Sequence, residues 1–109
     1  MARDEDLEAL LREHFGAGPG LKEKAMFGGR AWLLNGNLVC GALNGGMLVR
    51  LGNGNDRWAL ELPGTGSMMM RGRRMQGWVR AGPDAYGDGA LRGKLLDAAL
   101  AFVRTLPAK

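Results

Sequence analysis

Three apolar runs in the first half of the chain are separated by two Asn-Gly steps. The runs are Arg30–Leu34, Leu38–Leu43 and Met47–Leu51. An Asn-Gly step between β-prone runs is typical of a type I′ hairpin, because both central residues of that turn need a positive φ. The pattern therefore predicts a three-stranded antiparallel meander.

The segment before this meander is less regular. Leu21–Phe27 contains a run of charged residues, so we expect it to be an exposed approach to the sheet. Gly28 and Gly29 follow it, and a glycine pair beside a strand indicates a β-bulge or the close passage of another backbone. Further along, a second hairpin is predicted from Ser67–Met70 and Met75–Ala81.

Helical periodicity marks the start of the chain. In Asp4–Phe15 the residues Leu7, Leu10, Leu11 and His14 have the i, i+3, i+4, i+7 spacing of one buried helix face. The last helix has a longer apolar stripe of the same kind. It is predicted to run to about residue 106.

Polar residues indicate where the helices begin and what their outer sides carry. Asp4 is expected to cap the first helix, and Glu8 and Arg12 to form an ion pair on its outer side. Asn55 is expected to cap a short helix that continues through residue 62. Asp88 is the expected cap of the last helix.

The predicted element order is α-β-β-β-α-β-β-α, within one domain that covers residues 1–109. This order predicts an α+β fold. It would be a two-layer α/β sandwich with an antiparallel five-stranded sheet and helices mainly on one face. The other face of the sheet would be partly bare, and apolar side chains there would favour self-association or a partner.

The composition fits a globular protein, because 46% of the 109 residues are hydrophobic. The net charge of +4 is compatible with an acidic partner or nucleic acid, and also with a solvated surface that carries excess arginine. No apolar run approaches the ~18 residues of a membrane span. The acidic first residues are unlike a signal peptide, and a single cysteine fits a reducing compartment, so we expect a cytoplasmic protein.

Groups that could carry chemistry are few. Cys40 and His14 are the only thiol and imidazole, and a nucleophilic pair also needs an orienting third group. A structural zinc site needs about four ligands. The glycines of Gly87–Gly93 have the wrong spacing for a dinucleotide-binding motif, and Asp88 is better explained as a helix cap. We therefore expect no catalytic residues, no metal and no cofactor.

Two sets of residues in and around the second hairpin are candidates for binding. Methionine adapts to irregular partners, so the first set is a candidate protein-interaction surface, unless it fills the core under the last helix. Arginines grip phosphates, so the second set is a candidate nucleic-acid contact, unless it only keeps a loop tip soluble. The methionine set is Met68, Met69, Met70, Met75 and Trp78. The arginine set is Arg50, Arg71, Arg73, Arg74 and Arg80.

Five segments, in order along nearly the whole chain, resemble those of one known family. They are Lys24-Ala-Met-Phe-Gly-Gly29, Asn35-Gly36, Met47–Leu51, Met70–Val79 and Ala101–Pro107. On these segments the chain resembles the TfoX/Sxy N-terminal domain family. The resemblance implies a fold like that of secretion chaperones, α-β3-α-β2-α in two layers. It also implies a role near transcription or competence, because the namesake regulators promote competence-gene expression together with the cyclic-AMP receptor protein.

Those regulators carry a second, C-terminal domain, whereas this chain ends at Lys109, so we expect a stand-alone domain. The expected function is that of a non-enzymatic interaction module with a regulatory role, which works as a homodimer or with a protein partner. Nucleic-acid binding through the arginine set is the first alternative. An enzyme or small-ligand binder with an unrecognised site is the second.

Overall fold

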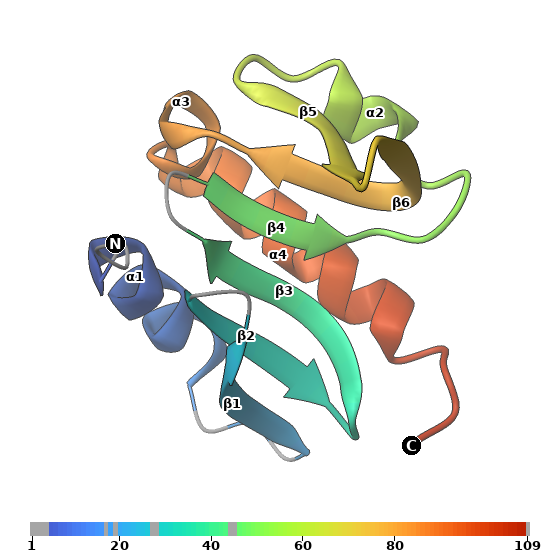
Figure 1. The fold of residues 1–109 in the computed structure, drawn as a ribbon. Coiled ribbons are helices and arrows are strands. Elements are labelled where there is room, and N and C mark those ends of the chain that lie inside the picture. Colours follow the sequence, from blue (N-terminus) through green and yellow to red (C-terminus); the bar gives the residue numbers. More distant parts are fainter. Residues whose placement is uncertain (1–4, 17, 19, 27–28, 44–45, 109) are drawn as a thin grey trace.

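Figure 1 shows the computed structural model of the chain, in which a curved antiparallel sheet lies in front of the long last helix. The structure describes residues 5–16, 18, 20–26, 29–43 and 46–108. In chain order the elements are α1 (Glu5–Phe15), β1 (Leu21–Met26), β2 (Gly29–Leu34), β3 (Asn37–Leu43), β4 (Gly46–Arg50), α2 (Arg57–Leu60), β5 (Thr65–Met70), β6 (Arg73–Ala81), α3 (Pro83–Tyr86) and α4 (Gly89–Val103).

The sheet has six strands in the order β1-β2-β3-β4-β6-β5, and neighbouring strands are antiparallel. The expectation of five strands is wrong, because the expected exposed approach forms β1 at one edge of the sheet. Lys22 and Lys24 are exposed there, while Glu23 between them is half-buried. Charged residues are typical of edge strands, since they discourage pairing with another chain. The rest of the fold class, an α+β domain with an antiparallel sheet, is confirmed.

The predicted meander is confirmed as β2, β3 and β4. Its first turn has the expected positive φ angles, 51° at Asn35 and 86° at Gly36. The second Asn-Gly step, at residues 44 and 45, lies outside the described residues, as does Gly28. The backbone of Ala42 passes close to Gly29, as the glycine pair predicted, because a Cβ at Gly29 would overlap the carbonyl oxygen of Ala42.

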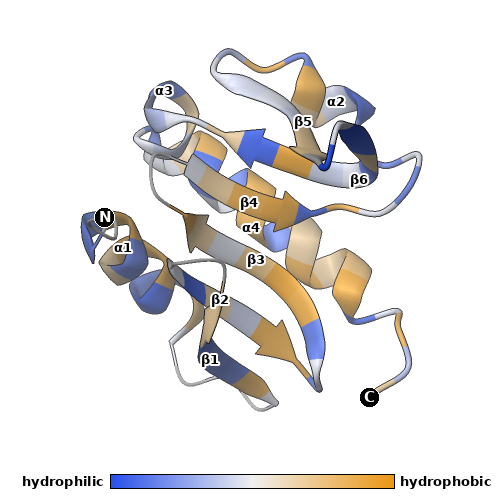
Figure 2. Ribbon diagram, in the orientation of Figure 1, coloured by the Kyte–Doolittle hydropathy of each residue, from blue (hydrophilic) through white to orange (hydrophobic). Residues whose placement is uncertain are grey.

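One row of paired residues crosses all six strands and shows which face the helices cover. In the order of the strands the row is Glu23, Trp32, Cys40, Val49, Val79 and Ser67. Its four central members belong to the core cluster, together with apolar residues of α1 and α4. Figure 2 shows the hydrophobic stretches of β3, β4 and α4 that build this core. The helices therefore pack on this one face, which we call the helix side.

The buried face of α1 differs from the prediction in its direction. It consists of Leu7, Glu8, Leu11 and Phe15, whereas His14 is exposed. Phe15 adds a third apolar residue at intervals of four, and this turns the helix so that Glu8 is only 2% exposed. Glu8 therefore does not lie on the outer side as expected, although, after the hydrogen bond to Glu23, its charge still helps to raise the pKa of Arg12. The expected cap of α1, residue 4, lies outside the described residues.

The ends of the other helices are partly as predicted. Asp88 caps α4 as expected, because its Oδ1 accepts hydrogen bonds from the backbone N–H of Ala90 at 2.9 Å and of Leu91 at 3.2 Å. The helix ends at Val103, three residues before the predicted end. Asp56, and not Asn55, occupies the N-cap of α2. The one-turn α3 was not predicted. Among the described residues, no helix combines the length and hydropathy needed to cross a membrane.

Candidate interaction surfaces

The opposite face of the sheet is covered by none of the described helices, and we call it the helix-free face. A second row of paired residues crosses it: Lys24, Ala31, Gly41, Leu48, Arg80 and Gly66. The middle of this row is closed to solvent, since Ala31 is 0% and Leu48 is 3% exposed. Lys24 and Arg80, towards its two ends, are exposed. The accessible part of this face therefore lies on either side of its middle, and each side carries an exposed cation.

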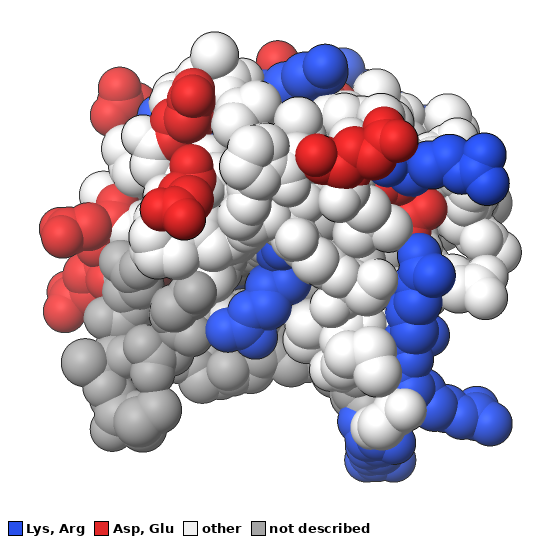
Figure 3. Space-filling model, turned by 90° about the horizontal axis from the view of Figure 1, so that it is seen from above, with Lys and Arg blue, Asp and Glu red and all other residues white. Residues whose placement is uncertain are grey.

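The charges on this face have one sign. Side chains alternate between the two faces of a strand, so Lys22 shares the face of Lys24, and Arg50 shares the face of Leu48. Glu23 is the only acidic residue in the described strands, and it lies on the helix side. Figure 3 shows the molecule from above, with several blue basic side chains in and beside a hollow and red acidic ones on the left and across the upper part of the view.

Two of these arginines are held against neighbouring groups. The side chain of Arg80 lies over Gly46, where a Cβ would come within 2.8 Å of its Nε and 3.3 Å of its Cγ. The guanidinium of Arg50 lies 5.4 Å from the ring of Trp78 and 5.7 Å from the ring of Phe102. Contacts of this kind orient an arginine and reduce the entropy that it loses on binding a partner.

The structure divides the arginine set between two faces. Arg80 lies on the helix-free face. Arg50 starts from that face at the end of β4, but its guanidinium reaches Phe102 of α4. Arg74 points to the helix side, where its Nη2 is 3.8 Å from Oδ2 of Asp56. Arg71 occupies the hairpin turn with a φ of 53°, and Arg73 is exposed next to it. Lys22 and Lys24 join Arg50 and Arg80 from β1. Sequence analysis missed these lysines because it did not predict β1 as a strand.

The methionine set is also divided. Met68 and Met75 pair across the β5–β6 hairpin and are half-buried, while Met69 is 54% exposed. None of these three residues belongs to the core cluster, so the alternative that the set fills the core under the last helix is wrong for them. Trp78 is half-buried beside Arg50. The side chain of Met70 lies outside what the structure describes.

A kink in β6 produces this division. The pairing between β5 and β6 shifts from Ser67 with Val79 to Met68 with Met75. At the shift, Gly77 has a φ of 85°, and a Cβ there would lie 2.5 Å from the backbone carbon of Gly52. Only glycine tolerates both conditions.

The kink is held by hydrogen bonds on both sides. The carbonyl oxygen of Gly77 accepts from the backbone N–H of Leu51 at 2.7 Å and of Gly52 at 3.1 Å. Its own N–H donates to Oδ2 of Asp56 at 3.2 Å, and Asp56 is only 8% exposed. A bulge is a common way to redirect side chains within a strand.

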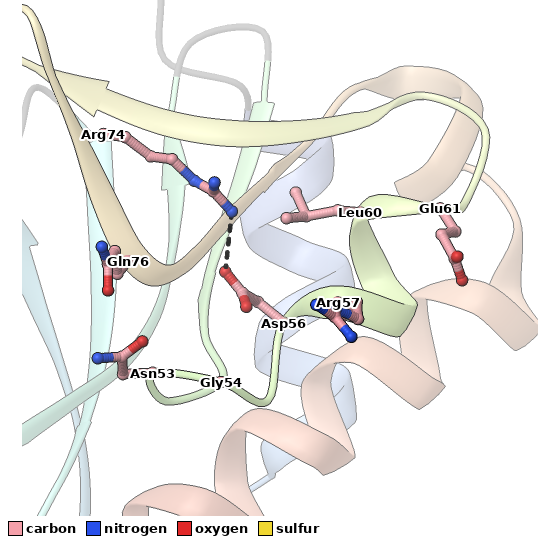
Figure 4. A pocket seen from close by; sticks show the side chains of 8 residues that line it. All are labelled: Asn53, Gly54, Asp56, Arg57, Leu60, Glu61, Arg74 and Gln76. Carbon is pink, nitrogen blue, oxygen red and sulfur yellow. Dashed lines mark ion pairs between the residues drawn. The ribbon is translucent and has the colours of Figure 1, made fainter.

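A polar pocket of about 540 Å³ lies between this kink and α2. Figure 4 shows Arg74 pointing at Asp56 across it, with Asn53 and Gln76 on one side. Its lining residues are Asn53, Gly54, Asp56, Arg57, Leu60, Glu61, Arg74 and Gln76. The two arginines are balanced by two carboxylates, so the pocket has no net charge that would select an anion or a cation.

Cys40 and His14 are not brought together as a reactive pair. Cys40 is 0% exposed in the core, and burial raises the pKa of its thiol well above the ordinary value. His14 Nε2 lies 2.9 Å from Oδ1 of Asp97 and links α1 to α4. A buried thiol that stays protonated is a poor nucleophile. Among the described residues, no three His, Cys, Asp or Glu side chains are grouped to hold a metal.

Glu23 forms the strongest ionic cluster that the structure describes. Its Oε1 accepts from Arg12 Nε at 2.8 Å, and its Oε2 accepts from Arg12 Nη2 and Arg30 Nε, each at 2.7 Å. The two hydrogen bonds from Arg12, and then the one from Arg30, hold the pKa of Glu23 at about 2, against the opposing effect of its partial burial. This cluster fastens α1 to the edge of the sheet.

Comparison with known proteins gives one match. The family model of the TfoX N-terminal domain matches residues 13–103. No curated protein and no solved structure matches the chain.

Proposed function

Because this chain belongs to the TfoX N-terminal domain family, we propose that it is a non-enzymatic, cytoplasmic interaction module that acts in the regulation of transcription or competence. It works as a homodimer or with a protein partner. The family supports the regulatory role, and the fold supports binding, because none of the described helices covers one face of the sheet.

The observation that carries this proposal is the single-signed helix-free face. A surface of one sign attracts partners of the other sign. The half-buried Trp78 beside Arg50 supplies an apolar contact between the cations, and aromatic residues beside arginine are the typical centres of protein interfaces. The partner expected here is an acidic protein surface.

Charge reversal on this face tests the proposal. The double variant K24E/R80E changes both sides of the face, and we expect it to abolish capture of the protein partner that the unchanged chain retains from its own cells. R104E, at the exposed end of α4, is the matched control and should leave capture unchanged. Light scattering on the same samples reports self-association. A chain that is monomeric at high concentration and retains no partner would contradict the proposal.

A second candidate function is nucleic-acid binding, and the same face favours it. Lys24 and Arg80 are separated by four strand spacings, which is roughly 19 Å. Several phosphates of one strand fit within that length, since they are spaced about 3.4 Å apart along the helix axis.

The salt dependence of binding to duplex and single-stranded oligonucleotides tests this candidate. K24E/R80E should weaken binding and make the slope of log K against log salt shallower by about 1 per lost phosphate contact. R74E is the control, because Arg74 points to the helix side. The candidate is wrong if neither oligonucleotide binds at low salt, or if R74E has the same effect as K24E/R80E.

A further inference from the structure

The outer side of α4 is unusually apolar. Every residue from 98 to 103 is apolar, and this stretch is longer than one helical turn. Ala99 and Val103 are buried in the core, whereas Ala101 is exposed and Phe102 is half-buried. A surface helix normally carries polar residues on its outer face, and a helix that is apolar all round is normally buried. The outer side of α4 therefore has the character of a contact surface.

A groove runs along this side of α4, next to α2, with a volume of about 650 Å³. Trp58 of α2 and Phe102 of α4 provide its largest apolar side chains. The complete lining is Leu51, Gly54, Asn55, Arg57, Trp58, Ala98, Ala101, Phe102 and Thr105. On α4 the lining residues Ala98, Ala101 and Phe102 are spaced i, i+3 and i+4, and Thr105 follows in the turn just after the helix. This spacing makes one continuous helix face, along which a second helix can pack.

Cations surround the two aromatic residues of the groove. The Lys94 Nζ lies 4.9 Å from the ring of Trp58, and the Arg50 guanidinium lies 5.7 Å from the ring of Phe102. Arg57 lies in the lining itself. No acidic side chain is found among the described residues that form the groove. The groove is thus apolar on its floor and positive at its sides.

We propose that this groove binds an acidic amphipathic helix of a partner protein. Apolar side chains of that helix pack between Trp58 and Phe102, and its flanking carboxylates pair with Lys94 and Arg57. Helix-in-groove recognition uses such i, i+3, i+4, i+7 anchors, and partly buried tryptophan is the residue type that most often dominates binding energy.

A second copy of the chain is a poorer occupant. The only large hydrophobic side chain that is exposed among the described residues is Met69, and it lies on β5 next to Arg74, not on an acidic helix. The proposal rests on the proposed function only in that the chain is an interaction module. The groove is lined by neither Lys24 nor Arg80, so failure of the proposal would leave the tests with K24E/R80E unaffected.

Two designed helical peptides test the proposal by calorimetric titration of the full chain. Both carry leucines at i, i+3, i+4 and i+7, and the leucines are flanked by glutamates in one peptide and by lysines in the other. We expect the glutamate peptide to bind and the lysine peptide to bind at least about tenfold more weakly, because like charges repel at a close interface. Each factor of ten corresponds to about 1.4 kcal/mol.

Two variants locate the site. A101E places a carboxylate in the groove at an exposed helix position, and it should lower the affinity for the glutamate peptide at least about tenfold. A9E makes the same change at an exposed position of α1 and should have no effect. The proposal is overturned if the two peptides bind equally or not at all, or if A101E leaves binding unchanged. It is also overturned if the chain is a dimer that A101E dissociates, because a second copy would then occupy the groove.

Discussion

The ionic cluster at Glu23 gives the sharpest prediction of stability. Replacing Glu23 with glutamine keeps the shape of the side chain and removes the charge that Arg12 and Arg30 share. The pKa of Glu23 falls from the ordinary 4.5 to about 2, and a shift of this size corresponds to at most about 3 kcal/mol. Because the Arg12 side chain is 53% exposed, water screens much of the interaction. We therefore expect E23Q to lower the free energy of unfolding by about 1–2 kcal/mol at neutral pH.

The effect should depend on pH in a defined direction. The pKa of Glu23 is lower in the folded chain than in the unfolded chain, so its stabilisation is fully present above about pH 5. It is lost as the pH falls from about 4.5 towards 2. Urea unfolding at pH 7, 4 and 3 measures this, and the difference between wild type and E23Q should shrink at each step. E13Q, which changes an exposed carboxylate of α1, is the control. A difference that stays constant with pH, or no loss of stability at pH 7, would refute the reasoning.

Three further predictions concern the core and the backbone. G77A should lower the free energy of unfolding by more than about 3 kcal/mol, because a Cβ there meets the backbone of the loop after β4. G72A should lower it by only about 1 kcal/mol, since the positive φ of 78° at Gly72 is combined with open space. Similar losses for the two variants in urea unfolding would contradict this. D88A removes the cap of α4 and should cost about 1 kcal/mol by the same measurement, and no loss would show that the cap is redundant. The buried thiol of Cys40 should react with a thiol reagent only at the rate of unfolding, and fast labelling of the folded chain would refute its burial.

Local turn and capping chemistry made much of the fold predictable. The positive φ angles at Asn35 and Gly36 follow from their residue types, and so does the cap at Asp88. The strand β1 was missed for a physical reason. The middle residue of its inward face is Glu23. From sequence alone a charged residue is predicted to be exposed, because its two arginine partners, from α1 and β2, become visible only in the fold.

The candidate surfaces were less predictable than the fold. The arginine set is grouped in sequence, but the kink at Gly77 sends Arg74 to the helix side while Arg80 stays on the helix-free face. A single positive φ inside a strand has no reliable sequence signal beyond the glycine itself. The groove beside α4 depends on Trp58 and Phe102, which are far apart in the sequence. Its only early indication is the long apolar stretch of the last helix.

The kink at Gly77 also divides the second hairpin into two parts with different support. Val79 and Ala81 of β6 pair with strands on both sides. Between the Met68–Met75 pair and the turn, β5 and β6 pair only with each other. A two-stranded ribbon is marginally stable by itself in water. Backbone amides of the outer ribbon should therefore exchange with deuterium well before those of the inner part. We therefore expect the arginine-bearing end of β6 to open more readily than the part of the strand that is paired on both sides.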